Sequence, residues 1–465
     1  MLEAIPDLIE IVPLHEPVRA SITVPGSKSI TNRALIAAAM ATGKTVLRGA
    51  LWSEDTQVMV EALRKLGFAI EVAADPRESS NRTITIEGSG GNVPNSGTVG
   101  LPLEIYVGNA GTAARFLSAL VCLGNGTYSL RGTSRMHERP QAALFNALRQ
   151  LGYHIESQNN KLPAVIHGGG PRAANCQINL HESSQFASAL LLCAKAGGWS
   201  VEVVGDDADE APYVAMTQKL IEAFSKKHDE FAIEPDTSSA SYFVAANWLV
   251  RLLARDVLEN GHNTDENYRR RQHAYTDLYN TLNVVAVAGF PKSDWQIDTA
   301  FDHYIPLPKQ ISRRTDLGDS IMTAMVLAPF ANQPTTFKDL QNLRLQECDR
   351  VSAMQTELTK CGVRVEVAGD DLTVFPSSKT LHGAEIETYD DHRMAMCFAI
   401  FGLRVPGIRL KNPACVKKTF PNFFQKLAAP PPQGLGQWIL DARTQSPLLL
   451  PQLGVNVEPS TPTRL

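Results

Sequence analysis

Apolar and polar positions repeat in a fixed order along this chain: an amphipathic helical stretch, a glycine, then a strand with alternating apolar residues. The order occurs three times, in EALRKLGFAIEV (Glu61–Val72), NALRQLGYHIES (Asn146–Ser157) and TELTKCGVRVEV (Thr356–Val367). Glycine after a last helical turn favours the left-handed cap, and β-branched residues after it favour a strand. Weaker copies lie at Leu220–Ile233 and Leu278–Val287, and a helix near Phe423–Leu427 lacks its strand. Up to six such units predict a repeated α/β architecture; ordinary helix–strand alternation without common ancestry remains an alternative.

Length and charge narrow the class of protein. The 465 residues are enough for two or three domains, and 44% hydrophobic with 20% charged residues is typical of globular chains. The 44 basic and 48 acidic residues give a formal net charge of −4. This balance provides no broad basic surface for nucleic acid or an anionic membrane, so we expect neither partner.

Cysteines and the N-terminal sequence indicate the compartment. Seven cysteines without a CxxC pair predict neither a disulfide framework nor a zinc knuckle, and favour a reducing environment. Acidic residues at Glu3, Asp7, Glu10 and Glu16 are atypical of a targeting peptide. Because no apolar run approaches the ~18 residues that span a bilayer, we predict a cytoplasmic protein.

Two regions depart from the repeated pattern. Arg251–Asp277 is rich in charge, and its acids dilute the basic run Arg269–Arg271, so a solvated helix or insertion is favoured over a nucleic-acid patch. The stretch from Ala429 onward begins Ala-Pro-Pro-Pro and carries further prolines, which predicts an extended tail that adds little to the core.

The candidate functional residues are lysines and arginines that lie next to turns rich in glycine, proline and serine. The segments are VPGSKSITNRALIAAA (Val24–Ala39), GNAGTAARF (Gly108–Phe116), RMHERP (Arg135–Pro140), SSQF (Ser183–Phe186), NLRLQECDR (Asn342–Arg350), TYDDHRMAMC (Thr388–Cys397) and KKTFP (Lys417–Pro421). A helix N-terminus with free amides, a lysine and hydroxyls suits an anion. Each cation alone is more often a surface charge, but together they suit a ligand with carboxylate and phosphate groups. Asp319 and Glu347 could transfer protons, and the scattered histidines predict no metal site.

In this order the motifs resemble the 5-enolpyruvylshikimate-3-phosphate synthase family of enolpyruvyl transferases. The resemblance runs from about Val12 to Leu427 and includes DTSSASYF as well as the segments above. It implies a two-lobed inverse α/β barrel, in which each lobe has three βαβαββ units and the ligands bind in the interlobe cleft. The expected domains are residues 1–26 with 237–428, residues 27–236, and an extended Pro-rich tail over 429–465.

The resemblance also implies a reaction and residue roles. Enolpyruvate would pass from phosphoenolpyruvate to the 5-hydroxyl of shikimate 3-phosphate, with no cofactor or metal, in a monomer that glyphosate inhibits. The implied catalytic residues are Lys28, Asp319 and Glu347. Those implied to bind phosphoenolpyruvate are Lys28, Gly111, Arg135, Gln185, Arg350, Arg393 and Lys418. Those implied to bind the acceptor are Ser29, Arg33, Ser183, Ser184, Gln185, Tyr213, Asp319, Asn342 and Gln346.

Three departures from the family pattern bear on these roles. Gln346 stands where the family has lysine, Glu210 where it has a phosphate-binding serine, and Phe116 where it usually has proline. The first two remove positive charge from the acceptor side, which leads to the hypothesis that shikimate 3-phosphate is a poor substrate. Gln346→Lys with Glu210→Ser would then improve its kcat/KM by about tenfold or more. The alternatives are a paralogue with another acceptor and a non-catalytic homologue that binds the ligand.

Overall fold

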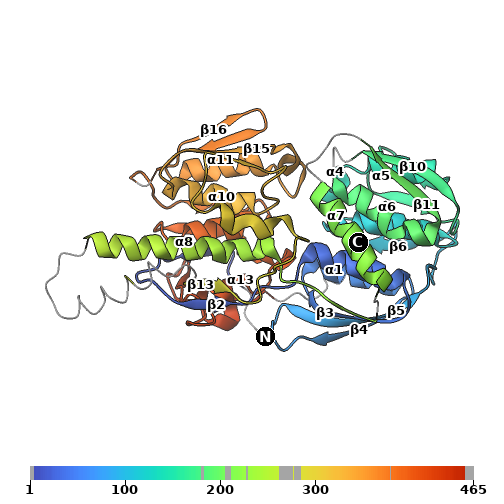
Figure 1. The fold of residues 1–465 in the computed structure, drawn as a ribbon, viewed down its shortest axis with the longest axis horizontal. Coiled ribbons are helices and arrows are strands. Elements are labelled where there is room, and N and C mark those ends of the chain that lie inside the picture. The colour runs from blue at the N-terminus through green and yellow to red at the C-terminus, as the bar shows by residue number, and fades with distance from the viewer. Residues whose placement is uncertain are drawn as a thin grey trace. The chain divides into compact units, whose positions relative to one another are not determined.

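The computed structural model describes residues 5–179, 183–204, 211–226, 229–260, 276, 284–377 and 379–455. The chain forms two compact units, drawn in Figure 1. Unit 1 contains the described residues of Met1–Val24, Asp236–Lys292 and Ile297–Asn456. Unit 2 contains those of Pro25–Pro235 and the short segment Ser293–Gln296.

Unit 2 is built from two four-stranded sheets and a strand pair. The first sheet has the order β12-β3-β5-β4, with β3 Thr42–Leu51, β4 Ala69–Ala74, β5 Asn81–Ser89 and β12 Glu230–Ala232. The second has the order β6-β7-β9-β8, with β6 Leu103–Tyr106, β7 Thr127–Arg131, β8 His154–Glu156 and β9 Ala164–His167. Strands β10 (Ala174–Asn179) and β11 (Trp199–Val204) form the parallel pair. The helices are α1 Lys28–Met40, α2 Glu54–Lys65, α3 Gly111–Leu120, α4 Ser134–Glu138, α5 Ala142–Gln150, α6 Ser184–Gly197 and α7 Ala211–Lys226, with the 3-10 turn η1 Val121–Leu123.

Unit 1 repeats this arrangement with its own strands. One sheet has the order β14-β15-β17-β16, with β14 Gln310–Ser312, β15 Thr335–Lys338, β16 Val365–Ala368 and β17 Asp371–Val374. The other has the order β18-β19-β1-β20, with β1 Leu8–Ile11, β18 Glu385–Ile386, β19 Ile408–Lys411 and β20 Ile439–Asp441. Strands β2 (Ala20–Ile22) and β13 (Val285–Val287) form its parallel pair. The helices are α8 Thr237–Asn260, α10 Ile321–Leu327, α11 Arg350–Lys360, α12 His392–Phe401 and α13 Phe423–Ala428. The 3-10 segments are η3 Ile297–Tyr304, η4 Ala328–Phe330, η5 Gln341–Leu345, η6 Pro413–Lys418 and η7 Leu450–Leu453.

All four larger sheets share one strand pattern, a parallel pair followed by two antiparallel pairs. In β6–β9 and in β14–β17 the chain order is βαβαββ without interruption. In the other two sheets a distant strand completes the pattern, β12 beside β3 and β1 between β19 and β20. The predicted fold class is confirmed by this recurrence and by the structural relatives reported below.

The three predicted helix–glycine–strand units are present at equivalent places. Helices α2, α5 and α11 each lead through a glycine into the edge strands β4, β8 and β16. The glycines are Gly67, Gly152 and Gly362, with φ of 92°, 87° and 79°. This left-handed conformation is unfavourable for residues with a Cβ atom, which explains why each repeat has glycine at this position.

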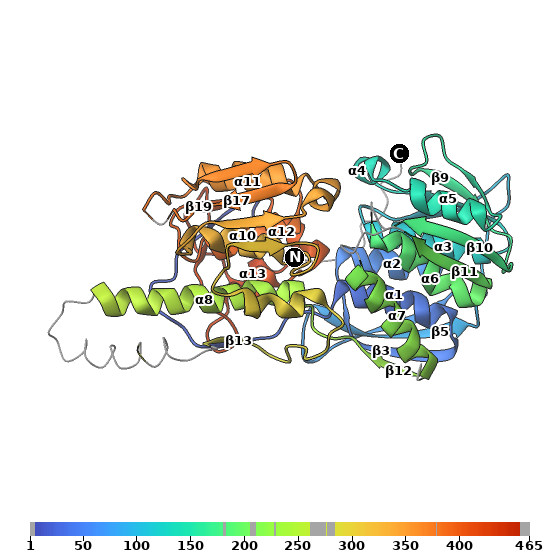
Figure 2. The same cartoon turned by 45° about the horizontal axis from the view of Figure 1, so that its top comes forward.

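Each unit has its own apolar core around central helices without an exposed face. Every residue of α3 in unit 2 and of α12 in unit 1 is buried. In unit 2, helices α1, α3, α6 and α7 pack against one another, as Figure 2 shows. No helix in the described part of the chain is long and apolar enough to cross a membrane.

The predicted extended tail is wrong for residues 429–455. Strand β20 pairs antiparallel with β1, and Leu435, Ile439 and Leu453 are at most 2% exposed in the core of unit 1. Pro431 and Pro432 lie in the turn before β20, Pro447 forms an isolated bridge with Leu440, and Pro451 lies in η7. The charged region after Arg251 continues α8 as far as Asn260, and its remainder, including Arg269–Arg271, lies outside the described residues apart from Thr276.

Candidate active site

Arg350 is the centre of a buried charge cluster in unit 1. It opens helix α11, whose N-terminus is capped by Asp349 through bonds from the amides of Val351 and Ser352. The Arg350 side chain is 1% exposed, and its Nε lies 2.7 Å from Asp391 Oδ2. Its Nη2 lies 3.2 Å from Asp391 Oδ1 and 2.9 Å from Glu347 Oε2. A guanidinium is suited to this task because its donors form a planar fork.

Glu347 lies between two cations. Its Oε2 accepts from Arg350, and its Oε1 lies 2.9 Å from Lys418 Nζ at the end of η6. The side chains of Glu347 and Lys418 are 7% and 6% exposed. Both carboxylate oxygens are therefore held in place, as a group positioned for proton transfer requires.

Asp319 provides a second and more exposed carboxylate. It lies just before α10, and its Oδ2 is 2.8 Å from Arg393 Nη2 in the first turn of α12. Its Oδ1 is 3.8 Å from both Arg350 Nη1 and Arg313 Nη2. The Asp319 side chain is 22% exposed, so of the two predicted acid/base groups it is the more accessible to a ligand.

Charges of both signs lie close together in the cluster. Arg313, Arg350, Arg393 and Lys418 face the carboxylates of Asp319, Glu347 and Asp391, and the carboxylates of Asp236 and Asp298 also act on Arg393. Burial opposes the charge of Arg350, but the carboxylates of Asp391, Glu347 and Asp319 outweigh it and raise its pKa. Burial likewise opposes the charge of Arg393, and its acidic neighbours, Asp319 foremost, raise its pKa well above the usual value. Both guanidinium groups therefore stay charged and can hold an anionic ligand.

Two residues of this cluster, Arg313 and Asp391, were not predicted from the sequence. Arg313 is 4% exposed and contacts Asp319, yet it lies in a segment without a quoted motif. Asp391 is fully buried, bonds Arg350, and caps α12 through the amide of Arg393. Asp391 stands directly before His392-Arg393, so its capping position was a signal that could have singled it out.

Asn342 and Gln346 precede α11. Asn342 lies in η5 and is 6% exposed. Gln346 is half-buried, and its side-chain oxygen accepts a short hydrogen bond from Arg350 Nη1. The neutral residue that replaces the family's lysine thus contacts the central guanidinium. Glu210, the other departure on the acceptor side, lies outside the described residues.

The start of α1 carries Lys28, Ser29 and Arg33 in unit 2. Ser27 caps the helix by accepting from the amide of Ile30, and Lys28 Nζ lies 3.2 Å from the buried Asp55 Oδ2. The Arg33 side chain passes into the unit, where it is 2% exposed.

The Arg33 guanidinium is held by three oxygens and an aromatic ring. Its Nε donates to Thr217 Oγ1 at 2.7 Å, its Nη2 to Ser188 Oγ at 3.1 Å, and its Nη1 to the Ser29 carbonyl at 3.0 Å. The ring of Phe116 lies with its centroid 5.4 Å from Arg33 Cζ, within range of a cation–π interaction. The phenylalanine that departs from the family pattern thus contacts a residue expected to bind the acceptor.

Gly111 opens α3 and is enclosed by two arginines. A Cβ at this position would lie 2.5 Å from Arg115 Nη1 and 2.8 Å from Arg139 Nη2, closer than real Cβ atoms come. Arg115 and Arg139 are 3% and 8% exposed. Glycine here allows two guanidinium groups to lie directly against the backbone at the start of α3. Arg135, on the short α4, pairs with Glu138 at 2.7 Å and is 38% exposed.

Ser183, Ser184 and Gln185 form the N-terminus of α6. Ser183 Oγ accepts from the amide of Gln185 at 3.2 Å, and Ser184 is 2% exposed. Tyr213 lies in the first turn of α7, where its carbonyl accepts from Thr217 Oγ1 at 2.9 Å. The structure therefore joins Asp319, Gln346, Glu347, Arg350, Arg393 and Lys418 in contacts within unit 1. It places Lys28, Ser29, Arg33, Gly111, Arg135, Ser183, Ser184, Gln185 and Tyr213 on α1, α3, α4, α6, α7 and the residue capping α6 in unit 2.

Comparison with known protein families shows to which family the chain belongs. Residues 14–227 and 225–427 match the family model described as EPSP synthase (3-phosphoshikimate 1-carboxyvinyltransferase). The chain belongs to the EPSP synthase family. A 3-phosphoshikimate 1-carboxyvinyltransferase of Nostoc punctiforme is 35% identical over 447 residues, covering 90% of this chain and 98% of the relative. Its namesake from Laribacter hongkongensis is 37% identical over 434 residues, covering 88% and 96%.

The fold agrees with that of a solved EPSP synthase. The structure of this enzyme from Acinetobacter baumannii superposes with a TM-score of 0.64 at 21% identity, covering 90% of this chain and 97% of that one. The resemblance read from the motifs is confirmed.

Proposed function

We propose that this EPSP synthase family member transfers the enolpyruvyl group of phosphoenolpyruvate to the 5-hydroxyl of shikimate 3-phosphate and releases inorganic phosphate. The observation that carries the proposal is the unit 1 cluster. Two carboxylates, Asp319 and Glu347, are held by Arg350, Arg393 and Lys418, the residue types that the reaction needs. The reaction belongs to the shikimate pathway of aromatic amino-acid biosynthesis.

The reaction has an addition step and an elimination step. In the addition, the 5-hydroxyl oxygen bonds to C2 of phosphoenolpyruvate, a base takes the hydroxyl proton, and an acid protonates the methylene carbon. In the elimination, the methyl carbon gives up a proton, the C=C bond re-forms and the C–O bond to phosphate breaks. We assign the acceptor hydroxyl to Asp319 and the second acid/base role to Glu347, with the Lys28 ammonium bridging both substrates.

The remaining polar residues bind the two substrates in this proposal. Cations stabilise the carboxylate and phosphate of phosphoenolpyruvate as charge moves onto the leaving phosphate. Phosphoenolpyruvate is bound by Lys28, Gly111, Arg135, Gln185, Arg350, Arg393 and Lys418. The acceptor is bound by Ser29, Arg33, Ser183, Ser184, Gln185, Tyr213, Asp319, Asn342 and Gln346. Glyphosate competes with phosphoenolpyruvate, and the enzyme works as a cytoplasmic monomer.

The decisive experiment is release of inorganic phosphate from phosphoenolpyruvate with a panel of acceptors, including shikimate and shikimate 3-phosphate. We expect turnover that requires shikimate 3-phosphate and is inhibited by glyphosate. Turnover with a different acceptor but not with shikimate 3-phosphate would indicate a paralogous enolpyruvyl transferase. Gln346 and Glu210 favour this alternative. No phosphate release with any acceptor, although calorimetry shows phosphoenolpyruvate binding, would leave the non-catalytic homologue that binds the ligand; absence of both would contradict the proposal and this alternative.

A further inference from the structure

A second group of side chains that could bind a ligand lies in unit 2, on the sheet β6-β7-β9-β8. His154 and Glu156 belong to the edge strand β8, and His167 ends the neighbouring strand β9. His154 and His167 are direct cross-strand partners. Residues two apart on a strand point to the same face, so Glu156 joins the two histidines there. The intervening pair Ile155 and Ile166 is buried on the other face.

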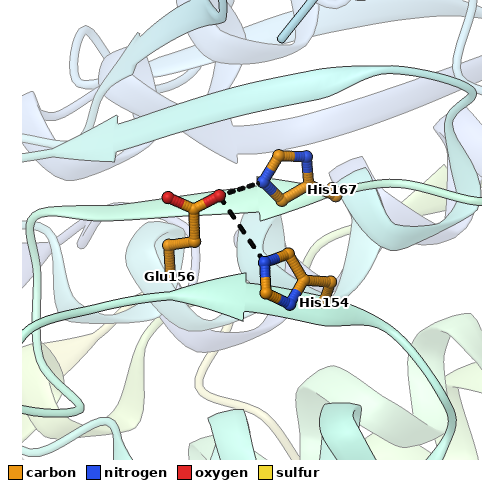
Figure 3. Close-up of side chains that lie close together, drawn as sticks. All are labelled: His154, Glu156 and His167. Atoms are coloured by element: carbon orange, nitrogen blue, oxygen red, sulfur yellow. Dashed lines mark hydrogen bonds and ion pairs between the residues drawn. The ribbon is translucent and has the colours of Figure 1, made fainter.

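The three side chains converge on one carboxylate oxygen, as Figure 3 shows. Glu156 Oε1 lies 2.5 Å from His167 Nε2 and 3.5 Å from His154 Nε2. One donor atom from each residue lies within 4.8 Å of the other two, and among the described residues this is the one group of three with such an arrangement.

We propose that His154, Glu156 and His167 bind a divalent transition-metal ion of the Zn²⁺ type, with solvent at the open positions. Two imidazole nitrogens and one carboxylate oxygen are ligands that Zn²⁺ accepts. Bonds of about 2.0–2.2 Å in tetrahedral geometry separate neighbouring ligand atoms by roughly 3.3 Å. The His154–Glu156 distance already fits. The His167–Glu156 distance opens by less than ~1 Å when the metal replaces the proton between the two atoms.

A neighbouring hydroxyl group and the solvent exposure of the ligands favour binding of the ion. His167 Nδ1 lies 3.4 Å from Thr127 Oγ1 on β7. A hydrogen bond from Nδ1 to this hydroxyl leaves the Nε2 lone pair for the metal, a common role of a second partner. His154 and Glu156 are 71% and 57% exposed, so an ion from solvent has access, and the bound ion would join β8 to β9.

The ligand set also discriminates between metals. Mg²⁺ and Ca²⁺ prefer sites of six or more oxygen ligands, and one carboxylate with two imidazoles does not supply these. His154, Glu156 and His167 are distinct from the residues assigned to the substrates, so metal binding here does not depend on the proposed reaction.

The test is calorimetry and thermal unfolding of the untagged full chain with Zn²⁺ or Ni²⁺, and with Mg²⁺ and Ca²⁺ as controls. We expect one Zn²⁺ per chain and a rise of several degrees in the unfolding midpoint. His154→Gln and His167→Gln should each weaken Zn²⁺ binding by about tenfold or more. The matched control is His303→Gln, because His303 is an exposed histidine with a single carboxylate partner, Asp302, at 3.7 Å.

Thermal unfolding of each variant without metal shows that it is folded. Retained Zn²⁺ affinity in the double variant His154→Gln/His167→Gln would overturn the inference. So would wild-type protein that takes up no Zn²⁺, or an equal response to Mg²⁺.

Discussion

Glu347→Gln tests the link between the buried cluster and turnover. The substitution keeps the shape of the side chain but replaces one carboxylate oxygen with an amide nitrogen. Glu347 is 7% exposed and bonds Arg350 and Lys418 at 2.9 Å each, so one of these cations then faces a donor. A hydrogen bond to a charged group contributes about 1.5–3 kcal/mol, which is the expected loss in the free energy of unfolding. Against a usual total of about 5–15 kcal/mol, the variant remains folded.

The effect on the reaction is much larger if Glu347 transfers a proton. Loss of a positioned acid or base lowers the rate by about 10²–10⁴, which raises the barrier by about 2.7–5.5 kcal/mol. The assays are phosphate release under saturating substrates and urea unfolding followed by circular dichroism. Thr335→Val is the matched control, because it removes one buried hydrogen bond, to the Pro308 carbonyl at 2.9 Å, without touching the cluster. A kcat of Glu347→Gln within a few-fold of the parent would refute the assigned role, and an equal loss in Thr335→Val would attribute the effect to stability.

Three further outcomes follow from contacts in the two units. Gln346→Lys removes the acceptor for Arg350 Nη1 and adds a like charge beside it, so urea unfolding should show a loss of about 1–2 kcal/mol; unchanged stability would contradict this contact. Gly111→Ala forces Arg115 and Arg139 to move, so steady-state kinetics should show a higher KM for phosphoenolpyruvate and weaker glyphosate inhibition. Unchanged values would contradict the assignment of Gly111 to the phosphoenolpyruvate site. Burial raises the pKa of the Cys176 thiol to about 11 and of Cys193 to about 12, so their labelling by a thiol reagent in native protein should be slow at pH 8 and rise about tenfold per pH unit. Labelling of either thiol at the rate of a free thiol would refute the burial.

Local features of the fold were predictable from the sequence. The helix–glycine–strand units were found because a glycine cap and the change of period from 3.6 to 2 are encoded within about twelve residues. The pairing of β20 with β1 was missed because it joins the two ends of the chain, and the prolines around β20 dominate the local composition. Nothing local distinguishes a short strand between prolines from an extended tail.

The candidate site shows the same division. Glu347 and Arg350 are candidates from one motif, and Glu347 Oε2 lies 2.9 Å from Arg350 Nη2, although Glu347 precedes α11 and does not lie on it. Arg313 was not predicted, because its contact with Asp319 depends on how the chain returns after β14. Likewise, the ring of Phe116 packs beside Arg33 from another helix, a contact that no local sequence pattern encodes. The grouping of His154, Glu156 and His167 was missed because His154 and His167 meet only through the register of β8 and β9.

The position of β1 has a consequence for how the protein is made. Leu8 pairs with Lys411, and Ile9 with Asp441, so β1 is synthesised long before either of its partner strands β19 and β20. At about 5–20 residues per second, the strand waits for roughly 20–90 s. Unit 2 is almost continuous in sequence and can fold during this delay, whereas unit 1 completes its second sheet only after β20 has been synthesised. A nascent chain that stops before Ile439 therefore leaves one side of β1 unpaired and open to association with other chains.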